Sequence, residues 1–165
     1  MAMNSVEANL LASAREGVIA HGCNALGVMG AGFAKQVKQI YPEAFRVYKQ
    51  WERERGLSLG SVSFAQVGER LWIANVVTQA RIYGAPGEML ADLDAIEAGF
   101  GEVGRKARAL GLPVEMPLVG CGLAGGKWDQ VEPRILKGLG EGVQSRLWLF
   151  TPPRAPERSW GQRPR

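Results

Sequence analysis

The segment Gly17-Val-Ile-Ala-His-Gly-Cys-Asn24 runs directly into Ala-Leu-Gly-Val-Met-Gly-Ala-Gly-Phe33, and this stretch decides the fold. Its first half is apolar without alternation, which predicts a strand that is buried on both faces, as in a parallel sheet. Gly27, Gly30 and Gly32 then permit positive φ angles and close backbone approach, and a helix is predicted over 33–41. Backbone N–H groups at such a helix N-terminus favour an anion without any lysine.

A second glycine cluster, Gly120-Cys-Gly-Leu-Ala-Gly-Gly126, lies between a predicted strand over 114–119 and a predicted helix over 128–139. In open α/β sheets ligands bind beyond the carboxyl ends of the strands, so both clusters are expected to line one crevice. Neither cluster has the Gly-Lys-Ser/Thr of a P-loop or the Rossmann spacing. Two such loops can clamp a diphosphate from both sides, and the alternative is that they are turns that only connect elements.

The rest of the chain alternates strand-like and helix-like segments. The further strands are predicted at 3–8, 61–67, 70–77 and 146–150, and a helix over 88–110 follows from apolar residues three and four apart. Pro42 either starts a second helix, which Gly56 ends, or kinks the first one. This order predicts an α/β fold in which helices cover a mainly parallel sheet, as one domain over residues 1–151.

Composition limits the function classes. A chain of 165 residues with 46% hydrophobic residues can bury one ordinary core. Two cysteines and one histidine are too few for a disulfide framework or a histidine-based zinc site, so neither a metal nor a cofactor is expected. The N-terminus shows no signal-peptide pattern, and no apolar run approaches membrane-spanning length, so a cytoplasmic protein without membrane contact is expected.

The formal net charge of +4 is held mostly by the C-terminal end of the chain. Residues 152–165 contain four arginines against one glutamate, which gives +3 and leaves +1 for the rest. This basic segment is rich in proline and arginine, and it is interpreted either as a flexible, solvated tail or as a contact with nucleic acid.

Several of these segments resemble the macro domain family. The matching segments are 18–34 with Tyr41-Pro42, 73–84, and Pro117-Leu-Val-Gly-Cys-Gly-Leu-Ala-Gly-Gly-Lys-Trp128. The resemblance implies a three-layer fold with a mixed, mainly parallel sheet of about six strands, a monomer, and binding of ADP-ribose or of ADP-ribosylated DNA or protein. The sequence is most similar to the branch that contains ADP-ribose-1''-phosphate processing proteins, terminal ADP-ribose glycohydrolase-like hydrolases and DNA-ADP-ribosyl antitoxins.

The resemblance also implies which residues bind the ligand. Asn9 stands where the family usually has an aspartate that accepts from the adenine amino group, and Asn24 matches the asparagine that hydrogen-bonds the distal ribose. The alternative for Asn24 is a cap at the end of a strand. The implied ligand-binding residues are Asn9, Leu10, Gly22, Asn24, Gly27, Val28, Met29, Gly30, Ala31, Gly32, Phe33, Gln79, Val119, Gly120, Cys121, Gly122, Leu123, Ala124 and Gly125.

The candidate catalytic residues are His21, Lys38 and Asn24. His21 is the only histidine, and the resemblance implies a role on the 1''-phosphate; a histidine in a buried strand can equally be a hydrogen-bonded core residue. The resemblance places Lys38 near the distal ribose, where burial would let it attack or polarise C1'', unless it belongs to a solvated helix face. Ala124 stands where one related hydrolase has a catalytic aspartate. Two functions therefore stay open: a hydrolase, or a reader that binds ADP-ribose without turnover.

Overall fold

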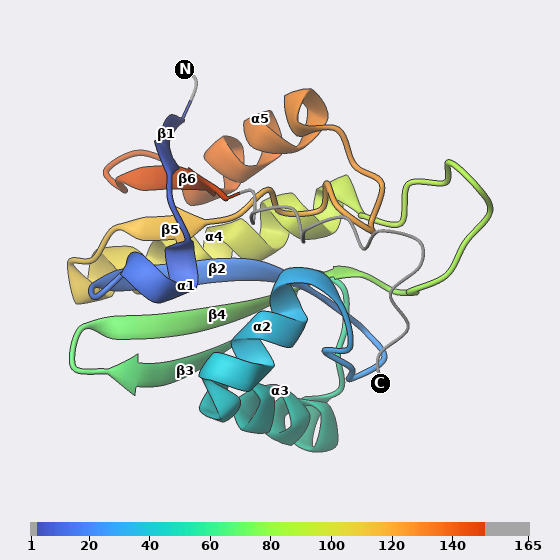
Figure 1. Cartoon of the computed structure of the whole chain (residues 1–165), viewed down its shortest axis with the longest axis horizontal. Coiled ribbons are helices and arrows are strands. Elements are labelled where there is room, and N and C mark those ends of the chain that lie inside the picture. The colour runs from blue at the N-terminus through green and yellow to red at the C-terminus, as the bar shows by residue number, and fades with distance from the viewer. Residues whose placement is uncertain (1–2, 151–165) are drawn as a thin grey trace, which may run out of the picture.

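The computed structural model describes residues 3–150, which form layers around a six-stranded sheet (Figure 1). The strands follow the order β1-β6-β5-β2-β4-β3 across the sheet. β3 runs antiparallel to β4, and the other neighbouring pairs are parallel. The predicted mixed, mainly parallel sheet is therefore confirmed, whereas the predicted basic tail over 152–165 lies outside the described residues. The strands are β1 (Asn4–Glu7), β2 (Gly17–Asn24), β3 (Val62–Gly68), β4 (Leu71–Gln79), β5 (Val114–Met116) and β6 (Ser145–Leu149).

Helices cover both faces of this sheet, which confirms the three-layer arrangement (Figure 1). The first face carries α1 (Leu10–Ser13), α2 (Gly32–Ile40) and α3 (Pro42–Arg55), and the opposite face carries α4 (Leu93–Leu110) and α5 (Trp128–Leu139). No helix between residues 3 and 150 combines the length and the apolar character that crossing a bilayer requires.

The central strand β2 has the predicted bounds, and its residues from Gly17 to His21 are all buried. Val18 and Ala20 pack into the core under α4 and α5, while Ile19 packs with Val37 on the face of α1 to α3. Because successive side chains of a strand point to opposite faces, a strand between two helical layers must be apolar at every position.

Pro42 begins α3 rather than kinking α2, as one of the two alternatives predicted. Its missing N–H costs nothing at the first position of a helix, where no intrahelical partner exists. At the other end, Gly56 closes α3 with a φ of +78°, a value that glycine adopts without the steric penalty of a side chain.

Two predicted boundaries are wrong by more than two residues. The helix predicted over 88–110 begins at Leu93, because the Asp92 carboxylate accepts a hydrogen bond from the Ala95 N–H at 2.9 Å and caps the helix there. The strand predicted over 114–119 ends at Met116, because Pro117 has no N–H to pair and residues 117–119 form a turn.

Two of the glycines in α4 lie where the helix packs closely against its neighbours. A Cβ at Gly104 would lie 2.6 Å from the carbonyl oxygen of Leu139, and a Cβ at Gly99 would lie 2.4 Å from Val76 Cγ1. These positions therefore need glycine, because α4 packs too closely on α5 and on the sheet to leave room for a side chain. Gly101 faces no atom closer than 3.8 Å and has no such reason to be glycine.

Candidate ligand-binding site

The sheet has a topological switch point between β2 and β5, where the connections that follow neighbouring strands go to opposite faces. The chain leaves β2 toward α2 on one face, and it leaves the neighbouring strand β5 toward α5 on the other face (Figure 1). A crevice forms at such a point beyond the carboxyl ends of the strands. A pocket of about 520 Å³ lies there, within the 300–1,000 Å³ that is usual for small-molecule sites.

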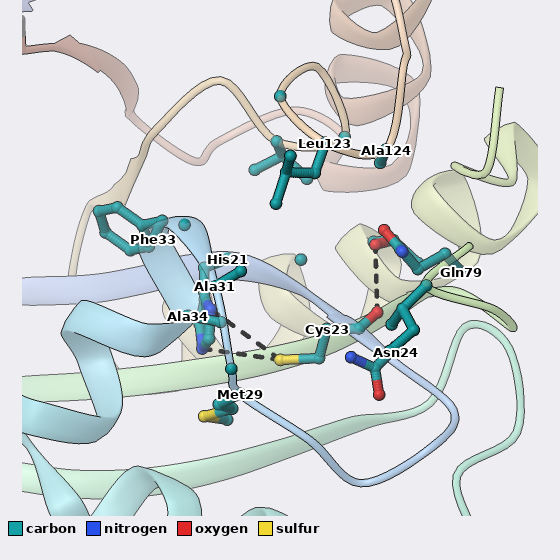
Figure 2. Close-up of a pocket in the computed structure, with 18 of the residues that line it drawn as sticks. His21, Cys23, Asn24, Met29, Ala31, Phe33, Ala34, Gln79, Leu123 and Ala124 are labelled. Atoms are coloured by element: carbon teal, nitrogen blue, oxygen red, sulfur yellow. Dashed lines mark hydrogen bonds between the residues drawn. The ribbon is translucent and has the colours of Figure 1, made fainter. Parts of the chain in front are cut away.

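Both glycine clusters line this one pocket, as predicted, and Leu123 and Ala124 face Ala31 and Phe33 across it (Figure 2). The predicted site residues that line the pocket are His21, Gly22, Asn24, Val28, Met29, Gly30, Ala31, Gly32, Phe33, Gln79, Val119, Gly120, Gly122, Leu123 and Ala124. The pocket is also lined by Ala34, which the resemblance places in the diphosphate loop, and by residues that were not predicted: Cys23, Thr78, Ile82, Tyr83, Pro117 and Leu118.

The first loop offers backbone donors to the pocket. Ala31 caps α2 without a side-chain hydrogen bond, and the first N–H groups of a helix have no partner within it. No hydrogen bond within residues 3–150 uses the N–H of Gly32, Phe33 or Ala34. A Cβ at Gly30 or Gly32 would meet no atom within 4 Å, so the space beside these N–H groups is open.

The second loop is closed by its own backbone and offers further donors. The Gly126 N–H donates to the Gly120 carbonyl at 2.8 Å, and a Cβ at Gly126 would lie only 2.4 Å from that same oxygen. Within residues 3–150, no hydrogen bond uses the N–H of Gly122, Leu123 or Ala124. The two loops therefore present unpaired N–H groups to one space, which suits an anionic ligand.

The lining carries no acidic or basic side chain apart from the neutral His21 described below. Its uncharged polar side chains are those of Asn24, Thr78 and Gln79. Tyr83 and Cys23 add a phenol and a thiol, and the other lining residues are glycine or apolar. Among the described residues, no group of three or more potential metal ligands comes together. An anion in this pocket would be held by backbone dipoles rather than by countercharges.

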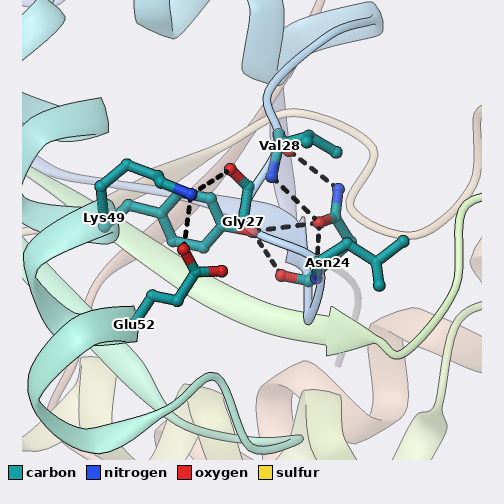
Figure 3. Close-up of polar contacts among 7 residues, drawn as sticks. Asn24, Gly27, Val28, Lys49 and Glu52 are labelled. Carbon is teal, nitrogen blue, oxygen red and sulfur yellow. Dashed lines mark hydrogen bonds and ion pairs between the residues drawn. The ribbon is translucent and has the colours of Figure 1, made fainter.

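Asn24 lines the pocket, but its side chain also holds its own loop (Figure 3). Its Oδ1 accepts from the Leu26 N–H at 3.0 Å, and its Nδ2 donates to the Val28 carbonyl at 2.8 Å. The hydroxyl of Tyr48 donates to the Asn24 carbonyl and lies 3.1 Å from its Oδ1. The cap interpretation thus matches the observed contacts, and a role of Asn24 in ribose binding stays a prediction.

Gly27 supports the first loop from behind rather than lining the pocket (Figure 3). Lys49 Nζ donates to the Gly27 carbonyl at 3.2 Å and pairs with the Glu52 carboxylate. A Cβ at Gly27 would lie 2.1 Å from Glu52 Oε2, and the φ of Gly27 is +78°. The positive φ therefore favours glycine at this position, and a side chain there would also displace the flexible ends of Glu52 and Lys49.

His21 is buried against the α3 face of the sheet and hydrogen-bonded. Its Nε2 lies 2.8 Å from Asn75 Oδ1, while Asn75 Nδ2 donates to the Ala44 carbonyl and to Ser63 Oγ. Since the Asn75 oxygen faces the ring, Nε2 carries the proton and Nδ1 is an acceptor. Burial lowers the pKa of His21 to about 4, although the hydrogen bond to Asn75 opposes this shift, so the ring is neutral at pH 7.

The other proposed catalytic residue, Lys38, does not line the pocket. It is exposed on α2, with its Nζ 4.2 Å from the centre of the Phe45 ring. The burial that a nucleophilic lysine needs is therefore not observed. The interpretation as a solvated helix face matches this placement, and a catalytic role for Lys38 stays a prediction.

Four more predicted ligand-binding residues lie outside the pocket lining. Asn9 caps α1, because its Oδ1 accepts from the Ala12 N–H at 3.2 Å, and Leu10 is buried in the core. Gly125 packs against the backbone of Glu88, where a Cβ would lie 2.8 Å from the carbonyl oxygen. Cys121 points back to the Val119 carbonyl, with Sγ at 3.4 Å. Their roles in binding stay predictions.

The unpredicted lining residues Ile82 and Tyr83 belong to the connection between β4 and α4. Both side chains are exposed although they are large and apolar or aromatic. A Tyr beside an Ile in a segment rich in Gly and Pro is a weak signal, and neither residue lies in a glycine cluster. The placement of this segment depends on contacts with distant residues, which the local sequence does not reveal.

The fold and site together define an α/β module with a backbone-lined ligand pocket. No family profile matches the chain. A macrodomain protein from Streptomyces coelicolor is 32% identical, with a TM-score of 0.72, and the match covers 89% of this chain and 98% of that one. A protein of unknown function from Bacteroides thetaiotaomicron is 29% identical, with a TM-score of 0.82, over 92% and 99% of the two chains.

Among curated proteins, the DNA ADP-ribosyl glycohydrolase of Mycobacterium tuberculosis is 31% identical over 120 residues. This match covers 70% of the chain but only 33% of the relative, so the chain spans about a third of that protein's length. The near-complete overlap with the Streptomyces coelicolor protein decides the classification: the chain belongs to the macro domain family.

Proposed function

We propose that the pocket binds ADP-ribose, with its diphosphate between the two glycine loops. The observation that carries this proposal is the convergence of unpaired N–H groups from Gly32 to Ala34 and from Gly122 to Ala124 on one space. Backbone donors at a helix N-terminus and in a glycine-rich turn suit phosphate oxygens. The pocket volume and the neutral lining fit a nucleotide whose charge is confined to its diphosphate.

We further propose that the chain is a hydrolase that removes ADP-ribose from modified DNA. Support comes from the similarity to the DNA ADP-ribosyl glycohydrolase of Mycobacterium tuberculosis. In this reaction water adds to C1'' of the distal ribose, the bond from C1'' to the base breaks, and the base takes up a proton. Gln79 is suited to orient that water, because its Nε2 donates to the Arg81 carbonyl at 2.7 Å and its Oε1 is an acceptor. Removal of phosphate from ADP-ribose-1''-phosphate would use the same end of the pocket.

The alternative function is a reader that binds ADP-ribose without turnover. It is favoured by the absence of any Asp, Glu, Lys or Arg among the residues that line the pocket in the described part of the chain. Hydrolases usually place a titratable side chain next to the reacting atoms, whereas the titratable residues that line this pocket are Cys23, Tyr83 and the buried, neutral His21.

Binding can be tested with a charge placed in the pocket. A Cβ at Gly122 would meet no atom within 4 Å, and this position has no positive φ, so a side chain is tolerated there. Gly122→Glu should abolish ADP-ribose binding in calorimetry by repelling the diphosphate, whereas Gly122→Gln, of equal size, should retain more of it. Both variants should melt like the wild type. If the wild-type protein does not bind ADP-ribose, the proposal is wrong.

Turnover is tested separately by incubating the wild type with an ADP-ribosylated oligonucleotide. Release of free ADP-ribose supports the hydrolase. Binding without any release, over enzyme concentrations that saturate the substrate, supports the reader. Release of phosphate from ADP-ribose-1''-phosphate, with no release from DNA, would assign the chain to the other reaction of this pocket.

A further inference from the structure

Large apolar side chains gather at the mouth of the pocket. Tyr83 is 82% exposed, Leu123 is 78% exposed and Ile82 is 36% exposed, and all of them line the pocket. Single exposed apolar residues are common on protein surfaces and need no explanation. These residues, however, come from two different loops and line the same pocket, which indicates a contact surface for a group that enters there.

The segment that carries Tyr83 is held in place by hydrogen bonds and an ion pair. Figure 1 shows it as the yellow-green connection that projects from the domain between β4 and α4. The Glu88 carboxylate pairs with Arg81 and accepts from the Ala85 N–H at 2.8 Å, so it closes the segment on itself. A Cβ at Gly84 would lie 2.3 Å from Glu88 Oε2, which shows how tightly the turn wraps around this carboxylate.

The far end of this segment is tied to the second glycine loop. The Leu90 N–H donates to the Ala124 carbonyl at 2.7 Å, and the Ala91 N–H lies 3.2 Å from the same oxygen. Tyr83 and Leu123 thus belong to two loops joined through Ala124. An aromatic side chain on such a support can receive a ligand without first ordering a flexible loop.

The position of Ile82 and Tyr83 in the pocket indicates which part of the substrate they contact. Gln79, at the end of β4, lies opposite Asn24 in the register of the neighbouring strand β2. The Ala25 N–H donates to the Gln79 carbonyl at 2.9 Å. The proposed reaction places C1'' of the distal ribose near Gln79, which is suited to orient the attacking water, and a modified macromolecule is attached through that atom. Ile82 and Tyr83 follow Gln79 by three and four residues, and their exposed side chains line the same pocket, so a group attached to C1'' passes beside them as it leaves the pocket.

We propose that Tyr83, supported by Ile82 and Leu123, forms a stacking platform for the nucleobase that carries ADP-ribose in modified DNA. This inference rests on the proposed function. A nucleobase has a flat face that stacks on an exposed aromatic ring, whichever base it is. The acceptor side chains of ADP-ribosylated proteins are flexible and polar and offer no such face, so the platform fits a base better than a peptide.

The test compares free ADP-ribose with an ADP-ribosylated single-stranded oligonucleotide. Stacking on one aromatic side chain contributes between about fivefold and about 150-fold in affinity, so Tyr83→Ala should weaken binding of the oligonucleotide roughly tenfold. The measured quantity is KM if the protein turns the substrate over, and Kd if it does not. Affinity for free ADP-ribose should stay within about twofold. Tyr83→Phe should retain the oligonucleotide affinity, because its ring still stacks.

A matched control is Leu59→Ala, because Leu59 is 44% exposed but does not line the pocket. Unchanged oligonucleotide affinity in Tyr83→Ala would overturn the platform, and so would an equal loss for free ADP-ribose, which would place Tyr83 on the ligand itself. A loss that appears only with ADP-ribosylated protein would overturn the choice of a nucleobase. Failure of the wild type to bind free ADP-ribose would refute the proposed function instead, so the two failures are distinguishable.

Discussion

Removing one buried hydroxyl, in the variant Tyr48→Phe, tests how α3 supports the pocket. The Tyr48 side chain is fully buried, and its hydroxyl reaches both the carbonyl and the side-chain oxygen of Asn24. The substitution leaves the ring in place, so it creates almost no cavity but takes a donor away from two acceptors. Losing such a buried hydrogen bond costs about 1–3 kcal/mol.

For a domain of this size each kcal/mol lowers the melting temperature by roughly 2–4 °C, so Tyr48→Phe should melt about 2–12 °C below the wild type. ADP-ribose affinity should also fall several-fold, because Asn24 anchors the turn that leads to the N–H groups of α2. Thermal melting followed by circular dichroism, together with calorimetry, measures both effects.

Tyr41→Phe is the matched control, because Tyr41 is only partly buried and none of the hydrogen bonds observed within residues 3–150 uses its hydroxyl. It should melt within about 1 °C of the wild type, as expected for a surface substitution. If Tyr48→Phe melts at the same temperature as this control and binds ADP-ribose equally well, the hydroxyl does not support the loop and the reasoning is refuted.

Three further outcomes are expected. Gly104→Ala should be destabilised in urea unfolding, since its Cβ would overlap the Leu139 carbonyl, whereas Gly101→Ala should gain up to about 1 kcal/mol; equal effects would contradict the packing argument. The pKa of His21 is lowered in the fold, so an unfolded chain binds the extra proton below pH 6.5, and the unfolding free energy should fall by about 2 kcal/mol between pH 7 and 5. His21→Gln should lack that part of the pH dependence, and an unchanged slope would show that His21 is not the cause. Lys38→Met should leave ADP-ribose affinity and release unchanged; slower release at unchanged affinity would restore Lys38 as a catalytic residue.

The features that local sequence determines were predictable. β2 has the predicted bounds because an unbroken apolar run between helical layers has no other favourable placement. The two glycine loops could be placed together because parallel neighbouring strands bring their carboxyl ends to one edge. The pocket lining from Gly30 to Phe33 and from Gly122 to Ala124 followed from that topology.

What the sequence left open depends on long-range contacts. The state of His21 is decided by Asn75, which lies 54 residues further along the chain, and by burial under α3. The segment before α4 was predicted as helix because its apolar spacing continues into Leu90, yet the Leu90 N–H pairs with Ala124 instead. The platform around Tyr83 was missed for the same reason, since its shape comes from Glu88 and from the second glycine loop.

A pocket whose donors belong to the main chain has a consequence for how such proteins diverge. Exchanging a wall side chain alters the contour of the cavity but leaves its amides where the turns hold them. The proposed recognition of the diphosphate depends on the backbone conformation of these turns, so it can persist when the side chains around the pocket are exchanged. New specificity would arise instead from substitutions at the entrance of the pocket, where the side chains contact the group that is attached to the ligand.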